Sequence, residues 1–432
     1  MKFPGRRKLK HYFPVSQPKP TLPSFEVRPE KDTYIVGLDE TIVDVVANVS
    51  EQFLNKFNIQ KGLSNLVDTK TASALYNELT AQECISDHFA GGTIGNTIHN
   101  YSVLADDKSV LLGVMSSNIK LGSPAYHYIC HTSSKVDMNH LQAVKGDIGR
   151  GITLITPDGE RTFAISPGDM DDLDTSHISE NIIAGAAALV TCAYPLRHQD
   201  KPIKQAMVKA LEYAHQHNVP TALTLGTKHL VEEHRDELLT LIKKYVNVLA
   251  MNELEAEALT GLSDPLEAAK AILDHVDLVL LTAGPTGMYL CGHTENTLKR
   301  ETSNPIKSAS LADFNRWEFS RPMLREACPE SIKVFSHIDP YMGGPEKISN
   351  TNGAGDGALS ALLHDISANH FHKESMPNSS KHAAPYLAYS SFAQICKYAN
   401  RVSYEILVQN ASRLSKGLPE QEDSLEEAYW ER

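Results

Sequence analysis

Short apolar runs alternate with amphipathic stretches along this chain from about residue 34 onward. Each run has the length of a strand, and the stretches 204–217, 236–245 and 253–274, which separate the later runs, have the periodicity of helices. Strands that alternate with helices predict βαβ units, and so a parallel sheet covered by helices. The runs that we expect to form buried strands are Tyr34–Leu38, Val110–Val114, Ala186–Cys192, Val219–Leu225, Val246–Met251 and Val276–Thr282.

Two segments depart from this alternation. Thr41–Val49 is rich in β-branched residues, and 152–165 has the pattern of a hairpin around Pro157-Asp158-Gly159. We expect them to form a small β-lid, discontinuous in sequence, on an α/β core. The predicted division of the chain is a basic, Pro-rich arm at 1–33, a core at 34–39, 69–145 and 169–432 with an irregular insertion at 292–348, and a lid at 40–68 and 146–168.

Composition excludes several classes of protein. Hydrophobic residues make up 41% of the 432 residues, too many for a disordered chain, and no run of about 18 apolar residues predicts a membrane span. The net charge of −12 gives no general reason to bind nucleic acid. The six cysteines form no C-x-x-C pair, and His229 and His234 miss the H-E-x-x-H spacing of zinc sites. We therefore expect a cytoplasmic protein with reduced thiols, which binds neither membranes nor nucleic acid.

The most informative segment is Asn352-Gly353-Ala354-Gly355-Asp356, which runs directly into an apolar, helix-forming stretch. The first amides of a helix have no partner within the helix, and small residues before it let an anion reach them. Asp356 lies in the same turn, where a carboxylate could accept a proton from a hydroxyl group that attacks phosphorus. An ordinary loop, with Asp356 as a first-turn acid, is the alternative.

Two further segments place polar groups beside such a site. Gly91-Gly92-Thr93 opens a predicted helix that contains Asn96, and adjacent glycines allow close approach to a ligand. Asn96 as a plain helix cap is the alternative. Asp39 and Asp44 follow the first strand, at the edge where open α/β sheets bind ligands, and a carboxylate there can accept two hydrogen bonds from a cis-diol.

Four short motifs follow one another along the chain. They are Gly91-Gly92 with Asn96, Asn252 with Glu255 (N-x-x-E), Thr282 to Gly287 (T-x-G-x-x-G), and Asn350 to Asp356 (N-T-N-G-A-G-D). Together they resemble the signatures of the ribokinase-like (PfkB) family of carbohydrate and nucleoside kinases, over about residues 34–410. The resemblance implies a three-layer α/β/α core with a mostly parallel sheet and a small β-lid.

The resemblance also implies roles for the residues of these motifs. Asp356 would be the general base, and the amides of Gly353, Ala354 and Gly355 would hold the migrating phosphoryl group. Asp44 would bind the ribose hydroxyls, with Asp39, Gly91, Gly92, Thr93 and Asn96 around the same substrate. Thr282, Gly284, Gly287 and Asn352 would lie near ATP, and Asn400 near its adenine.

The metal assignments are more open. Asn252 and Glu255 resemble the family element linked to Mg²⁺, but the same spacing is that of a capping box. Many family members have Asp at the position of Asn350, where the loop helps to hold an activating K⁺. An amide offers an oxygen but no charge, so K⁺ activation stays open.

The stretch Val43 to Phe57 looks like the lid of the adenosine-kinase branch, and the whole chain is most similar to kinases of inosine and guanosine. The resemblance therefore implies transfer of the γ-phosphoryl group of ATP to the 5′-hydroxyl of inosine or guanosine, giving IMP or GMP. Arg197 could donate to the purine 6-oxo group, although a surface charge is the more ordinary interpretation. A sugar kinase and a catalytically silent nucleotide sensor are the alternatives, and a homodimer stays open.

Overall fold

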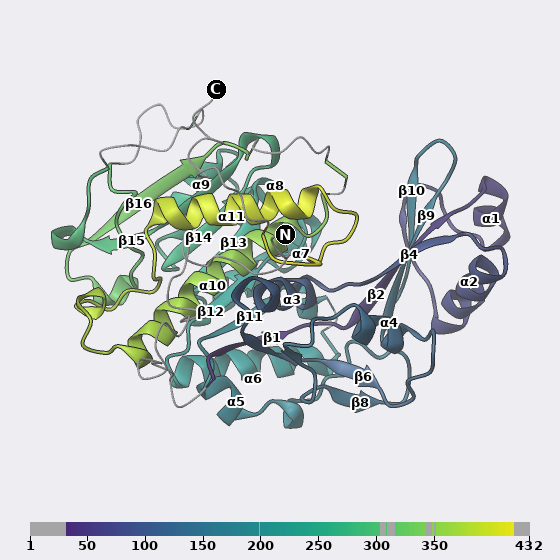
Figure 1. Cartoon of the computed structure of the whole chain (residues 1–432). Coiled ribbons are helices and arrows are strands. Elements are labelled where there is room, and N and C mark those ends of the chain that lie inside the picture. Colours follow the sequence, from purple (N-terminus) through teal and green to yellow (C-terminus); the bar gives the residue numbers. More distant parts are fainter. Residues whose placement is uncertain are drawn as a thin grey trace, which may run out of the picture.

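The computed structural model describes residues 32–197, 199–302, 308, 316–341, 348–349 and 351–418. Residues 1–31 of the expected basic arm, residues 419–432 and the expected K⁺ position Asn350 lie outside these residues. Two sheets organise the described part: a large one covered by helices and a smaller one that projects from one side of it (Figure 1).

The large sheet has nine strands in the order β16-β15-β14-β13-β12-β11-β1-β5-β7. Its pairs are parallel from β14 to β7, while β15 and β16 add an antiparallel edge. All six predicted strands are confirmed, with ends shifted by a few residues. The strands are β1 (Tyr34–Leu38), β5 (Lys108–Leu112), β7 (Val136–Asp137), β11 (Ala188–Cys192), β12 (Thr221–Thr224), β13 (Val248–Asn252), β14 (Leu278–Thr282), β15 (Met288–Glu295) and β16 (Ser331–Ile338).

Helices cover both faces of this sheet and give the three layers that were predicted. One face carries α3 (Thr93–Ala105), α10 (Ala354–Ser375) and α11 (Phe392–Leu407), which pack on one another (Figure 1). Because both faces are covered, strands such as β11 are buried along their whole length, which is why they read as continuous apolar runs. The other face carries α5 (Glu180–Ala184), α6 (Pro202–Gln216), α7 (Lys228–Tyr245), α8 (Glu253–Thr260) and α9 (Pro265–Ile272).

Two features of the core differ from the prediction. The stretch 253–274 is two helices, because Gly261 ends α8 in a left-handed conformation and Asp264 caps α9 immediately afterwards. The range 292–348, expected to be an irregular insertion, contains the end of β15 and all of β16, which pair to complete the sheet. Polar residues such as His293 and Lys333 interrupt the apolar pattern of this edge hairpin, which hid it in the sequence.

The small sheet, with the helices packed on it, is called the lid below. Its strand order is β3-β10-β9-β2-β4, and β9 and β10 form the predicted hairpin. The expected lid ranges omit β4, which pairs with β2, and α2; both fall in the range expected for the core. The elements of the lid are β2 (Ile42–Asn48), α1 (Glu51–Lys56), β3 (Ser64–Leu66), α2 (Thr69–Ala81), β4 (Ile85–Ala90), β9 (Gly149–Ile155) and β10 (Arg161–Ser166). The helix α4 (Pro124–Cys130) packs on β2 and β4. In the core, β6 (Val114–Ser116) pairs with β8 (Gln142–Val144).

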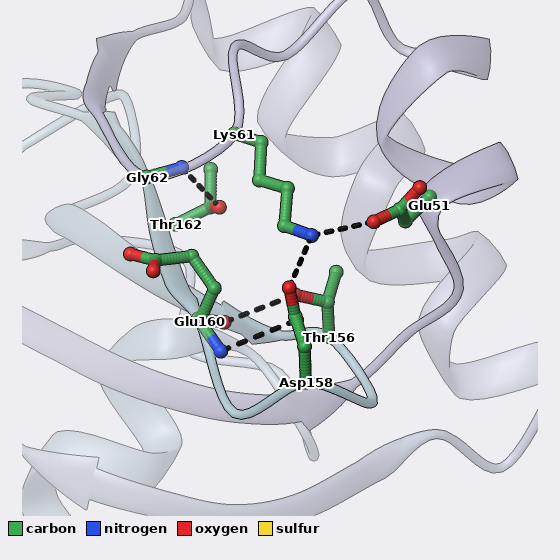
Figure 2. A network of polar contacts seen from close by, with 7 residues as sticks. All are labelled: Glu51, Lys61, Gly62, Thr156, Asp158, Glu160 and Thr162. Carbon is green, nitrogen blue, oxygen red and sulfur yellow. Dashed lines mark hydrogen bonds and ion pairs between the residues drawn. The ribbon is translucent and has the colours of Figure 1, made fainter.

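One lysine links the two segments that form the tip of the lid. Figure 2 shows Lys61 between Glu51, at the start of α1, and Asp158, in the turn of the β9–β10 hairpin. The Lys61 Nζ atom lies 2.5 Å from the first carboxylate and 2.6 Å from the second. The Thr156 hydroxyl donates to Asp158 at 2.6 Å and so fixes the turn itself.

Among the described residues, no helix is long and apolar enough to cross a membrane.

Candidate active site

Asp356 lies in the first turn of α10, next to the glycine-rich loop that precedes the helix. Gly353 begins the helix in a left-handed conformation (φ 80°), and among the described residues no side chain caps the first turn. A Cβ on Gly353 would lie 2.5 Å from the Cβ of Ser412, so only glycine fits both the space and the backbone angle. Gly355 is exposed, which leaves this end of the helix open to solvent. The arrangement can receive an anion.

The carboxyl group of Asp356 is half-buried and is held by Asn96 of α3. The Asn96 Nδ2 atom donates to Asp356 Oδ2 at 3.1 Å, across 260 residues of sequence. Burial raises the pKa of Asp356 to about 7; the hydrogen bond from Asn96 opposes this rise, and the neighbouring Asp39 carboxylate adds to it. A carboxyl group with such a pKa can exchange a proton near neutral pH.

Gly91 and Gly92 connect β4 to α3, and they bring the start of α3 against the end of β1. Gly92, at φ 86°, is the N-cap, which makes the interpretation of Asn96 as a plain cap wrong. The cap is supplied instead by Asp39, whose Oδ2 accepts from the amides of Ile94 and Gly95 at 2.8 and 2.9 Å. A Cβ on Gly92 would lie 2.7 Å from the same oxygen, so the glycine allows this approach. Thr93 begins the helix beside it.

Asp44 lies in the middle of β2, within the lid rather than at the end of the first strand. Its neighbours Val43 and Val45 are buried on one side of the sheet, while Asp44 is half-buried on the other. A Cβ on Gly91 would overlap the Asp44 carboxylate, which places this side chain directly beside the glycine pair. Burial raises the pKa of Asp44 to about 6, and the charge of Arg413 opposes the rise.

Arg413 was not predicted from the sequence, although it contacts several of the residues above. It is 6% exposed and donates to Asn96 Oδ1 and to the Gly91 carbonyl, both at 2.9 Å. The segment that contains it forms no helix or strand and matches no motif, so nothing in the sequence indicates this contact.

Arg197 lies in an ion pair with Glu40, a second residue that was not predicted. The two side chains come from the carboxyl ends of β11 and β1, which are neighbours in the sheet. The Arg197 side chain remains 33% exposed and packs over the ring of Tyr194 at 4.8 Å. The pair therefore adjoins Asp39 at the edge of the sheet, and it is not an isolated surface charge. The adjacent acids Asp39-Glu40 after the first strand were the available signal for Glu40.

Most of the residues predicted to bind ATP follow strands farther along the same sheet, while Asn352 lies in the loop before α10. Thr282 ends β14, and Gly284 and Gly287, both with positive φ, shape the turn into β15. Asn400 of α11 donates to the carbonyl of Asp339, just after β16, at 2.7 Å. Asn352 lies in the exposed loop before α10. The structure thus gathers the turn, the end of β16 and α11 near one another.

Asn252 and Glu255 form a capping box at the start of α8. The amide and side chain of Asn252 donate to the two Glu255 oxygens at 2.9 Å, and the Glu255 amide donates back to Asn252 at 2.9 Å. Burial raises the pKa of Glu255, which lies near enough to Asp356 to influence it. Among the described residues, no group of three or more His, Cys, Asp or Glu could hold a metal ion by itself.

Comparison with known proteins identifies relatives of this chain in sequence and in fold. Residues 129–308 match the family model described as pfkB family carbohydrate kinase. The chain is 56% identical to the guanosine-inosine kinase of Escherichia coli K12 over 436 residues, which cover 100% of both proteins. The solved adenosine kinase of Sinorhizobium meliloti has a TM-score of 0.61 at 19% identity, over 89% of this chain and 97% of that one. The adenosine kinase of Schistosoma mansoni in complex with 2-fluoroadenosine has a TM-score of 0.61 at 15% identity, over 89% and 98%.

At such low identity the solved structures bear on the fold alone, and they confirm the predicted ribokinase-like architecture. The bacterial relative is much more similar, and it aligns with this chain from end to end. With 56% identity over the full length, and with the family model matched in its central part, the chain belongs to the pfkB family of carbohydrate kinases.

Proposed function

We propose that this protein transfers the γ-phosphoryl group of ATP to the 5′-hydroxyl group of guanosine and inosine, giving GMP and IMP. One observation carries the proposal: the Asp356 carboxyl group, with a pKa raised to about 7 by burial, lies in the uncapped first turn of α10. A relative of the same length and high identity is a guanosine-inosine kinase. The cytoplasm, where ATP is available and the buried free thiols stay reduced, is the compartment that we propose.

In the proposed reaction Asp356 is the general base. Its carboxylate accepts the proton of the nucleoside 5′-hydroxyl while that oxygen bonds to the γ-phosphorus. The bond from the γ-phosphorus to the bridging oxygen of ADP breaks, and the electron pair leaves with ADP. Asn96 keeps the carboxylate pointed at the acceptor through its 3.1 Å hydrogen bond. General bases of this kind typically accelerate a reaction about 10²- to 10⁴-fold.

The main chain at the start of α10 supplies the charge stabilisation. No described side chain caps the amides of Gly353, Ala354 and Gly355, and these amides lie at the positive end of a helix of 22 residues. Oxygens of the migrating phosphoryl group would bind these amides. Because the amides are fixed before the reaction, little reorganisation is needed when charge develops.

The acceptor nucleoside would lie between the lid and α3. The Asp44 carboxylate, half-buried beside Gly91, would accept hydrogen bonds from the 2′- and 3′-hydroxyls of ribose. Gly92, Thr93 and Asn96 would border the sugar. Asp39 would act indirectly, because two amides of α3 already occupy its Oδ2 atom. Arg197, partly exposed next to Glu40, would donate to the purine 6-oxo group.

ATP would bind near Thr282, Gly284 and Gly287, with Asn352 near its phosphates and Asn400 near its adenine. Mg²⁺ usually binds through one or two carboxylates, several waters and substrate phosphates, so a complete protein cage is not required. Glu255 fits that pattern through water, because both of its oxygens already accept from Asn252. When bound, Mg²⁺ would neutralise charge on the phosphates.

A substrate panel tests this function. Purified protein with MgATP and guanosine, inosine, adenosine or ribose is assayed for ADP and for the phosphorylated acceptor by chromatography. We expect kcat/KM to be highest for guanosine and inosine, with GMP and IMP as products. A higher kcat/KM for ribose or adenosine would overturn the substrate assignment, and absence of turnover with all four would overturn the enzyme assignment. The Arg197→Met variant should lose preference for 6-oxopurines over adenosine if Arg197 reads the 6-oxo group.

A further inference from the structure

The short segment that follows α11 turns back beside that helix (Figure 1), and its residues 412–414 lie on α3. Its backbone is tied to α3 on both sides of Arg413. The Leu414 amide donates to Asn100 Oδ1 at 2.8 Å, and Asn100 Nδ2 donates to the Ser412 carbonyl at 3.2 Å. Ser412 also contacts Gly353, at the entry to α10. The segment 412–414 therefore lies between the proposed phosphoryl-binding loop and the proposed acceptor site.

The Arg413 side chain is buried at this junction and uses its donors on protein atoms. Besides Asn96 and Gly91, it donates to Thr132 Oγ1 at 2.7 Å, and its guanidinium packs over the ring of Tyr128 at 5.0 Å. A Cβ on Gly95 would lie 2.8 Å from Arg413 Nη2, so the glycine of α3 makes room for the guanidinium. A cation with its donors occupied in this way is suited to hold other groups and has little capacity left for a phosphate.

The contact with Asn96 has a directional consequence. An Asn side chain has an acceptor and a donor at opposite ends, and reversing it exchanges the two. Arg413 donates to the oxygen of Asn96, which turns the nitrogen of Asn96 toward Asp356. Without Arg413, the Asn96 side chain could reverse and present its oxygen to the Asp356 carboxylate, where it cannot donate. The same guanidinium fixes the Gly91 carbonyl, beside which Asp44 lies.

We propose that Arg413 is a positioning residue of the acceptor site, which orients Asn96 toward Asp356 and holds the Gly91 turn beside Asp44. The segment after α11 thereby completes a site whose other parts come from the first half of the chain and from α10. The inference rests on the proposed function, because it assigns Arg413 a role in the same phosphoryl transfer. Arg413 acts through Asn96 and Gly91, and it does not touch the reacting atoms.

Steady-state kinetics of three variants test this role. Arg413→Met removes the hydrogen bonds, and Arg413→Lys keeps the charge but offers one donor nitrogen in place of the two that reach Asn96 and Gly91. We expect both to lower kcat with guanosine about 100-fold, the cost typical of small misplacement at a reacting centre, with the KM for ATP unchanged. Lys416→Met, which removes an exposed cation three residues away, is the matched control and should behave as the wild type.

Two further measurements separate positioning from a purely structural role. Adding guanidinium ions to Arg413→Ala should recover about tenfold in kcat, while methylammonium should recover none. In an Asn96→Ala background, Arg413→Met should cost clearly less than it does in the wild type, because only the hold on the Gly91 carbonyl is then left to lose. Wild-type kcat in Arg413→Lys, additive losses in the double variant, or loss of the folded state in both Met and Lys variants would overturn the proposal. A wild-type protein without kinase activity would instead overturn the proposed function.

Discussion

The proposed acceptor half of the site and the proposed ATP half are built in different ways. In the acceptor half, side chains that are distant in sequence hold one another: Arg413 donates to Asn96, Asn96 donates to Asp356, and Asp44 lies beside Gly91. In the ATP half, the shape comes from the main chain. Gly287 has φ 100°, and the Ala283 amide donates to its carbonyl at 2.8 Å to close the turn after β14.

The difference suggests where chemistry and affinity reside. Burial raises the pKa of Asp356 to about 7 and of Asp44 to about 6, so the charge state of the acceptor half is sensitive to its neighbours. A backbone turn carries no titratable group and depends mainly on glycine conformation. Substitutions in the acceptor half should therefore change kcat, acceptor KM and pH dependence, whereas those in the ATP half should change the KM for ATP alone.

The largest effect is expected for Asp356→Asn. The amide keeps the size of the side chain but cannot accept the acceptor proton, so kcat should fall about 10²- to 10⁴-fold. Guanosine binding, measured by calorimetry, should stay within about threefold of the wild type. A kcat close to that of the wild type would show that the acceptor half does not carry the base, and the contrast between the halves would disappear.

A second large effect is expected at Asp44, in KM rather than in kcat. Asp44→Asn removes a carboxylate that we propose to accept two hydrogen bonds from the ribose diol, and hydrogen bonds to charged groups are worth about 1.5–3 kcal/mol each. The KM for guanosine should rise about 100-fold, while the KM for ATP stays constant. The 2′-deoxynucleoside is the matched substrate control: it should lose less on this substitution than guanosine does. An unchanged KM for guanosine would remove Asp44 from the acceptor half.

The two halves were also unequally accessible to prediction from sequence. The loop Gly353 to Asp356 and the turn Thr282 to Gly287 are local motifs. The first could be located from its residues and the second from its resemblance to a family signature, because each lies next to a predicted strand or helix. Arg413 could not be found in this way, because its contact with Asn96 spans 317 residues and its segment has no periodic pattern. The lid strand β4 was missed for a related reason, since only its pairing with β2 assigns it to the lid.

The N-x-x-E motif at Asn252 illustrates a different limit. The same spacing serves a metal-linked motif and a capping box, and the structure contains the complete capping box. The geometry of the cap leaves the Glu255 carboxylate near Asp356, so the two interpretations are compatible in this fold. Sequence spacing could not separate them, because both require the same two residue types at the start of a helix.

The pH dependence of kcat/KM should test whether Asp356 is the base of the acceptor half. Burial raises the pKa of Asp356 to about 7, and the base must be deprotonated to act. Activity should therefore be full above about pH 7 and fall about tenfold per unit as the pH drops below it. Asn96 lowers this pKa by donating to the carboxylate. The Asn96→Ala variant should therefore lose activity at a higher pH, so that the acidic limb of its pH profile moves upward. A limb near pH 4, or one that Asn96→Ala leaves in place, would contradict the assignment.

The smallest effect is expected in the ATP half, at Asn400. Asn400→Ala removes the donor to the Asp339 carbonyl, a 2.7 Å bond that ties α11 to the end of β16. The neighbouring turn keeps its shape because the Ala283 amide and the glycines hold it independently. We expect the KM for ATP to rise only about threefold to tenfold, the range of one neutral hydrogen bond, with the KM for guanosine and the pH limb unchanged. A shift of the pH limb would mean that α11 also sets the charge state of Asp356, in which case the two halves would not be independent.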